Sequence, residues 1–199
     1  MKSFVNFLSI FRIIASFAII PTLMYQWYAV SFVLFILAAA SDFFDGWLAK
    51  KYNATSKIGG VLDHIGDKFL VVNTMIMLSI MMPVWFIFIP IIIMIARELY
   101  ISGLREFLGT QKIEMPVPKA RFSMGKIKTT LQMVALSAFL LLFVLTTFIT
   151  PETITRTYLM LLNILSQIGI VVLWAALIAS LWSATQYTRT FAEKLKKIK

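Results

Sequence analysis

Four aspartates lie close together in a chain that is otherwise strongly apolar. Asp42, Asp45, Asp63 and Asp67 are four of the nine acidic residues among 199, with spacings of three, eighteen and four. Spacings of three and four place both members of a pair on one face of a helix, with Cβ atoms about 5–6 Å apart. Two facing pairs can converge on one cluster of oxygen ligands. Such ligands suit Mg²⁺ or Mn²⁺, and two such ions about 3.5–4 Å apart form a clamp used in phosphoryl transfer.

A simpler alternative is that each aspartate is a solvated helix cap or part of an interfacial ion pair. Either interpretation suits one aspartate alone, but four charges in apolar segments must be offset, since each costs about 2.5–3.5 kcal/mol at the bilayer centre. His64 and Lys68 each directly follow a carboxylate and therefore point away from its helix face. We therefore predict two divalent ions held by the four aspartates.

The composition is that of a polytopic membrane protein. The chain is 60% hydrophobic and only 14% charged, and its mean hydropathy is +0.86. The absence of cysteine and the single histidine exclude a disulfide scaffold, a Cys/His zinc site and an ordinary serine-histidine triad. A net charge of +10 favours anionic lipids or phosphate-bearing substrates, although basic cytoplasmic loops explain it equally well.

Six apolar segments must position these groups, each close to the roughly 20 residues that span a bilayer. They cover residues 7–24, 28–49, 61–82, 84–106, 125–149 and 159–184. We predict an all-α membrane protein with six transmembrane helices and one domain, 1–199. Because Arg156 is the only basic residue in the connections at 25–28, 82–83 and 150–158, the positive-inside rule predicts that both termini are cytoplasmic. Arg12 interrupts the first segment, which we interpret as a retained helix and not a signal peptide.

The aspartates belong to a longer pattern, "DFFDGWLAKKYNATSKIGGVLDHIGD", residues 42–67. It resembles the Asp-x2-Asp-Gly-x2-Ala-Arg-x8-Gly-x3-Asp-x3-Asp signature of the CDP-alcohol phosphotransferases at seven of eight fixed positions. Lys50 stands where the signature has arginine, which keeps the charge but loses the planar bidentate fork. "NFLSIFR" resembles the opening of the family, and "ARELYISGLRE" with "MGKIKTTLQM" resembles its members that use a glycerol phosphate acceptor.

The resemblance implies a six-helix membrane enzyme, usually a homodimer, that takes CDP-diacylglycerol and an alcohol and releases CMP. The four aspartates would hold two Mg²⁺ or Mn²⁺ ions on the diphosphate, and Asp67 would be the catalytic base. The residues expected beside CDP-diacylglycerol are Asn6, Gly46, Ala49, Lys50 and Gly59. The expected acceptor is sn-glycerol 3-phosphate. The expected location is the cytoplasmic membrane, among membrane lipids, with the active site facing the cytoplasm and no nucleic-acid partner.

An acceptor that carries a phosphate needs cations. We expect Arg105 and Lys126 to bind that phosphate, with Arg97 and Arg121 behind them. Arg97 lies inside an apolar segment beside Glu98, so it is either in an internal ion pair or a phosphate ligand. For the lysines, topology and snorkelling to lipid phosphates are the alternative, and snorkelling is also the default expectation for Arg12.

Other functions are compatible with parts of this pattern. Another family member could use serine, inositol or inositol phosphate as its acceptor. A cation or proton transporter also carries intramembrane carboxylates, but places them near the bilayer midplane and commonly shows repeated halves, which this sequence lacks. A purely structural membrane subunit leaves the four aspartates unexplained.

Overall fold

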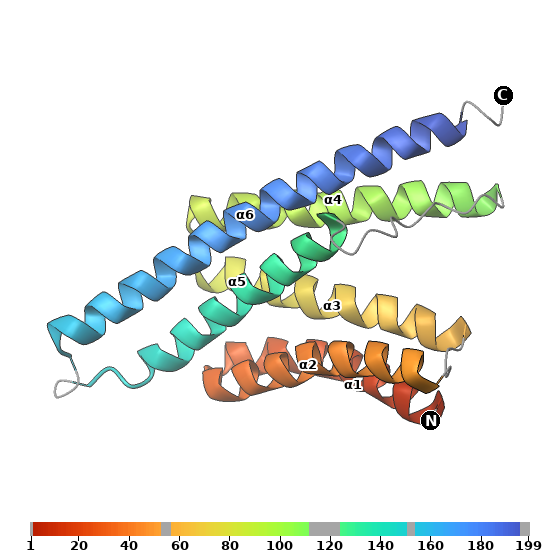
Figure 1. The fold of residues 1–199 in the computed structure, drawn as a ribbon. Coiled ribbons are helices and arrows are strands. Elements are labelled where there is room, and N and C mark those ends of the chain that lie inside the picture. Colours follow the sequence, from red (N-terminus) through yellow and green to blue (C-terminus); the bar gives the residue numbers. More distant parts are fainter. Residues whose placement is uncertain (1, 53–56, 112–123, 151–153, 196–199) are drawn as a thin grey trace.

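The computed structural model consists of six long α-helices (Figure 1). It describes the backbone of residues 2–52, 57–111, 124–150 and 154–195, and the side chains of residues 6–41, 59–111, 124–150 and 154–195. The helices are α1 (Lys2–Met24), α2 (Tyr28–Tyr52), α3 (Lys57–Met81), α4 (Trp85–Thr110), α5 (Met124–Thr146) and α6 (Arg156–Leu195). No strand occurs in these ranges, so the predicted all-α class with six helices is confirmed.

The helices follow the apolar segments closely, because a continuous apolar stretch of about 20 residues is by itself enough to indicate a membrane-spanning helix. The described connections at 25–27 and 82–84, each of three residues, reverse the chain between α1 and α2 and between α3 and α4. Gln26, with φ of 60°, closes the turn between α1 and α2, and its N–H donates to the carbonyl of Leu23 at 3.0 Å. The helix α6 is 40 residues long and continues to Leu195, beyond the predicted end at 184. Its last turns continue beside α4, where Tyr187 accepts a hydrogen bond from Arg105 and the ring of Phe191 packs against that of Phe107.

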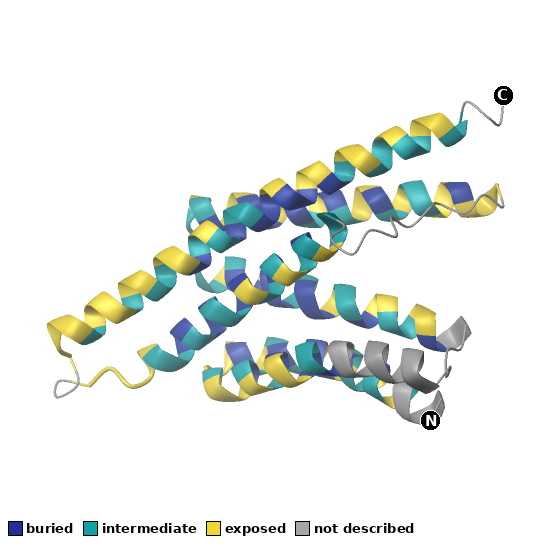
Figure 2. Cartoon of the chain, viewed as in Figure 1, coloured by how far each residue is buried: buried dark blue, intermediate teal, exposed yellow. Residues whose placement is uncertain are grey.

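The apolar surface of the bundle identifies a polytopic membrane protein. Five helices, α1, α3, α4, α5 and α6, contain described segments long and apolar enough to cross a membrane. The described side chains of α2 form a shorter apolar segment, Tyr28–Ser41, while its backbone continues as helix to Tyr52. Large apolar side chains such as Val33, Ile80 and Val171 are exposed. Exposed residues follow the outer faces of the helices (Figure 2), as expected of a protein that faces lipid.

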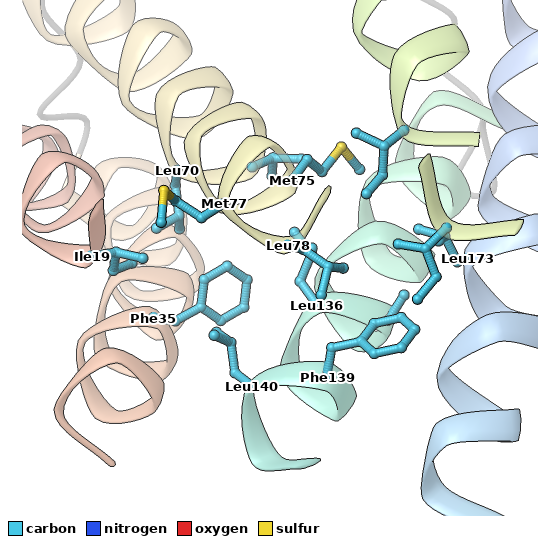
Figure 3. Packing of buried hydrophobic residues seen from close by; sticks show 14 of the residues in the cluster. Ile19, Phe35, Leu70, Met75, Met77, Leu78, Leu136, Phe139, Leu140 and Leu173 are labelled. Atoms are coloured by element: carbon cyan, nitrogen blue, oxygen red, sulfur yellow. The ribbon is translucent and has the colours of Figure 1, made fainter. Parts of the chain in front are cut away.

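The helix α5 connects two groups of helices. On one side α1 packs against α2 and α3, and on the other α6 packs against α4, while α5 contacts α2, α3 and α6. The shared core includes Phe35 of α2, Leu70 of α3, Phe139 of α5 and Leu173 of α6 (Figure 3). A Cβ added at Gly169 of α6 would lie 3.1 Å from the ring of Phe139, so this glycine allows α5 and α6 to approach closely.

The described helix ends alternate between the two ends of the bundle. Figure 1 shows that the first turn of α1, the last turns of α2, α4 and α6, and the first turn of α3 lie toward the same end. An even number of antiparallel spans requires this arrangement. It places the end of α2 and the start of α3, which carry the aspartate pattern, at the end of the bundle that also holds the first turn of α1 and the last turn of α6.

Candidate active site

Asp63 and Asp67 lie in the first three turns of α3 and face α1. Nη1 of Arg12, on α1, donates to Oδ1 of Asp63 at 2.8 Å and also to Oδ1 of Asp67. The two carboxylate oxygens are therefore closer than two hydrogen-bond lengths, as a spacing of four on one helix face predicts. The Arg12 side chain is 0% exposed, whereas those of Asp63 and Asp67 are 42% and 31% exposed. The pair thus has a buried side, closed by a cation, and an accessible side.

Arg12 also links this pair to α2. Its Nε donates to Oγ of Ser41 at 3.4 Å, and the hydroxyl of Ser41 donates to the carbonyl of Ala38 at 2.7 Å. Ser41 directly precedes Asp42 in the sequence. One guanidinium therefore contacts both helices that carry the aspartate pattern.

Small residues allow α1 to approach α3 at this level. Gly66 is buried between Asp63 and Asp67. A Cβ at Gly66 would lie 3.4 Å from the carbonyl oxygen of Ser9 and 3.5 Å from Cβ of Arg12. A side chain larger than alanine at this position would push α1 away from α3 and move Arg12 away from the carboxylates.

The expectation that Arg12 snorkels to the interface is wrong. Snorkelling requires a path from the helix to solvent, but α1 packs this face against α2 and α3, and the guanidinium is fully buried. Within the predicted segment 61–82 only His64 and Lys68 were available as counter-ions, and among the described side chains the ion pairs of Asp63 and Asp67 are with Arg12 instead. The missed cation comes from another helix, 51 residues before Asp63. The available signal was the three-residue spacing of Asn6, Ser9 and Arg12, which places them on one face of α1.

Several predicted residues lie outside the described side chains. The backbone of α2 is helical through Tyr52, but the side chains of Asp42, Asp45, Gly46, Ala49 and Lys50 are not described, so their convergence on the α3 pair stays a prediction. Of the remaining residues predicted to lie beside CDP-diacylglycerol, Gly59 is buried in the first turn of α3 and Asn6 is half-buried in α1. Among the side chains that are described, no three potential metal ligands gather.

A second polar cluster lies between α4, α5 and α6. Oε1 of Glu98 accepts a hydrogen bond from Nη1 of Arg97 at 2.8 Å and another from Nζ of Lys128, while Nη2 of Arg97 donates to Oγ of Ser183 at 2.9 Å. We refer to Arg97, Glu98, Lys128 and Ser183 as the Glu98 cluster. Of the two possibilities for Arg97, the internal ion pair is present. Its Nε is buried and has no hydrogen-bond partner among the described residues.

Lys68 brings α3 close to this cluster. Its Nζ donates to Oγ of Ser102 at 2.5 Å, and the hydroxyl of Ser102 donates to the backbone carbonyl of Glu98 at 2.8 Å. Lys68 directly follows Asp67. The helix α3 therefore presents carboxylates toward α1 and an ammonium group toward α4, so that anionic and cationic groups lie on two different faces of one helix.

The other residues predicted to bind the acceptor phosphate have different surroundings. Nη2 of Arg105 donates to the hydroxyl of Tyr187 at 2.8 Å, and its guanidinium carbon lies 4.9 Å from the centre of the Tyr187 ring. Lys126 is exposed in the first turn of α5 and pairs with none of the described carboxylates. Arg121 lies outside the described residues.

Comparison with known proteins identifies the family. A family model for CDP-alcohol phosphatidyltransferases matches residues 3–182. The CDP-diacylglycerol–glycerol-3-phosphate 3-phosphatidyltransferase of Rickettsia typhi is 40% identical over 148 residues, which cover 71% of this chain and 78% of that protein. The enzyme of the same name from Rickettsia bellii is 42% identical over 143 residues, 68% and 74% of the two chains. That from Sodalis glossinidius is 34% identical over 185 residues, 92% and 91% of the two chains. The chain therefore belongs to the CDP-alcohol phosphatidyltransferase family.

Proposed function

We propose that this membrane transferase moves the phosphatidyl group of CDP-diacylglycerol to sn-glycerol 3-phosphate, giving phosphatidylglycerophosphate and CMP. The relatives described above carry this activity in their names. The observation that carries the proposal is the arrangement around α3. Asp63 and Asp67 converge on one cation on one face of this helix, and Lys68 reaches toward the Glu98 cluster on the other. A diphosphate bound through cations needs the carboxylates, and a phosphorylated acceptor needs the positive charges. The two environments must be neighbours for the two substrates to react.

The residues present fit a divalent metal site. Oδ1 of Asp63 and Oδ1 of Asp67 converge on Nη1 of Arg12, so the pair is built to surround a positive charge, and its accessible side is open to a second cation. The proposed ligands are these two carboxylates with those of Asp42 and Asp45. When bound, two Mg²⁺ or Mn²⁺ ions would neutralise the diphosphate and stabilise the departing CMP.

The chain's own residues have the remaining roles in the displacement. In the proposed reaction the acceptor hydroxyl oxygen forms a bond to the phosphorus of the phosphatidyl group, and the bond to the CMP oxygen breaks with its electron pair leaving on CMP. The carboxylate of Asp67 takes the hydroxyl proton. Asn6 and Gly59, with Gly46, Ala49 and Lys50, are proposed to line the CDP-diacylglycerol site.

The acceptor phosphate is assigned to cations beyond α3. Arg105 and Lys126 are the proposed direct ligands, together with Arg121. Both nitrogens of the Arg97 fork already bind Glu98 and Ser183, so Arg97 is proposed to add positive charge from behind. A positively charged site of this kind favours a phosphorylated acceptor over serine or free inositol.

The proposal is tested with purified protein in detergent, CDP-diacylglycerol, Mg²⁺ or Mn²⁺ and a panel of alcohols, scored for CMP release. We expect CMP with glycerol 3-phosphate, little with serine or inositol, and loss of turnover in Asp67→Asn. Release with inositol phosphate alone would keep the family chemistry but reassign the acceptor. A wild-type protein that releases no CMP with any alcohol and is indistinguishable from Asp67→Asn would refute the enzyme assignment.

The proposal includes the setting of the enzyme. We place it in the cytoplasmic membrane, as a single domain over residues 1–199, with the end of the bundle that carries the aspartate pattern facing the cytoplasm. The distribution of basic residues along the chain supports this orientation. A homodimer is part of the proposal through the family resemblance, and cross-linking in native membranes tests it.

A further inference from the structure

Arg12 has an arrangement that a simple structural ion pair does not require. It is 0% exposed and lies where α1, α2 and α3 meet. A single nitrogen atom contacts two carboxylates on α3, and the same guanidinium reaches Ser41, next to Asp42 on α2. Arg12 carries one positive charge, whereas Asp63 and Asp67 carry two negative charges. The side chains of these aspartates are 42% and 31% exposed, so a further cation can reach the pair from the side away from Arg12.

We propose that Arg12 is a built-in counter-ion of the metal site. It holds Asp63 and Asp67 together before a divalent ion binds, and its own charge then weakens the binding of that ion. The consequence is a site that is ordered without metal yet binds metal weakly enough to release it. This inference rests on the proposed metal site at the aspartates, and it assigns Arg12 as a positioning residue, not a catalytic one.

Electrostatics decides the direction of the effect. A buried positive charge within hydrogen-bonding distance of two metal ligands repels an incoming cation. The repulsion is strong because the buried guanidinium is out of contact with water, which would otherwise weaken the interaction between the two charges. Removing the charge should therefore tighten metal binding. The metal-free protein should respond in the opposite way, since Asp63 and Asp67 then lose the cation that both of them contact and repel each other more strongly. A residue with a purely structural role would weaken both the fold and the metal site when replaced.

The experiment measures binding of Mn²⁺ alone, without substrate, to chelator-treated protein in detergent. Electron paramagnetic resonance of free Mn²⁺ reports the Kd, and thermal unfolding with and without Mn²⁺ reports the Tm. The variants are Arg12→Gln, which keeps polarity but removes the charge, and Arg12→Lys, which keeps a charge on a shorter stem. Arg156→Gln is the matched control, because Arg156 is an exposed arginine at the start of α6.

We expect Arg12→Gln to bind Mn²⁺ at least about ten-fold more tightly than wild type, with a lower Tm in chelator and a larger rise of Tm on adding Mn²⁺. Arg12→Lys should have an intermediate Kd, and Arg156→Gln should match wild type. If Arg12→Gln does not fold without metal, the test is the Kd of Arg12→Lys for Mn²⁺. A Kd below that of wild type supports the counter-ion role, and a Kd equal to or above it contradicts that role.

Two results would overturn the inference in different ways. Wild-type protein that binds no Mn²⁺ would remove the proposed metal site together with the role of Arg12. Wild-type protein that binds Mn²⁺, while the Arg12 variants bind it equally or more weakly, would remove the counter-ion role alone and leave the proposed function intact.

Discussion

The negative charge of Glu98 is held between two buried cations, which makes it sensitive to substitution. Its carboxylate accepts from Nη1 of Arg97 and from Nζ of Lys128. The side chains of these two cations are only 7% and 9% exposed, and that of Glu98 is 20% exposed. In Glu98→Gln the shape is nearly unchanged, but two like charges remain buried without a counter-ion. Breaking a buried ion pair by removing one partner costs about 3–5 kcal/mol, and the partial exposure of Glu98 places our expectation near the lower end.

The assay is reversible unfolding in mixed micelles titrated with dodecyl sulfate, which gives the free energy of unfolding. We expect Glu98→Gln to lower it by about 3 kcal/mol. The double variant Glu98→Gln/Lys128→Met should recover part of this loss, because one of the two uncompensated cations is then gone. Glu106→Gln is the matched control, since Glu106 is an exposed glutamate on the same helix. A Glu98→Gln protein as stable as Glu106→Gln, or a double variant less stable than the single one, would refute the reasoning.

Three further predictions concern packing, the acceptor and topology. Gly169→Ala should lower the free energy of unfolding by about 1 kcal/mol, because the added Cβ would lie 3.1 Å from the buried ring of Phe139. Gly103→Ala is the control and should not destabilise the protein, since no atom lies within 4 Å of a Cβ added there. Equal effects of the two substitutions would contradict the packing argument. Lys126→Ala should raise KM for glycerol 3-phosphate about ten-fold or more with little change in kcat. The reason is that the exposed Lys126 makes no ion pair with the described carboxylates and is available to the acceptor phosphate. An unchanged KM would point to an uncharged acceptor. Because the chain contains no cysteine, a single introduced cysteine is the sole target of an impermeant maleimide. In the proposed orientation Arg156→Cys should react in intact cells and Glu193→Cys only after lysis. The reverse pattern would invert that orientation.

Local features of the structure were predictable from the sequence. The six helices follow the apolar segments, because helix formation and bilayer length are both satisfied within one continuous stretch of chain. The shared helix face of Asp63 and Asp67 follows from their spacing alone. The pairing of Arg97 with Glu98 was one of two possibilities that the sequence left open, and the structure shows this ion pair.

Only the tertiary structure decided which distant groups complete these features. Nothing in the spacing of the aspartates indicates that Arg12 lies against them, 51 and 55 residues away, or that Lys128 and Ser183 join Arg97 and Glu98. Periodicity determines which side of each helix a residue occupies, but not which helix covers that side. In this protein α1 packs against the face of α3 that carries Asp63 and Asp67, while α6 packs against α4 and Lys128 reaches Glu98 from α5. A charge in apolar surroundings is stable only beside the partner that such an arrangement supplies.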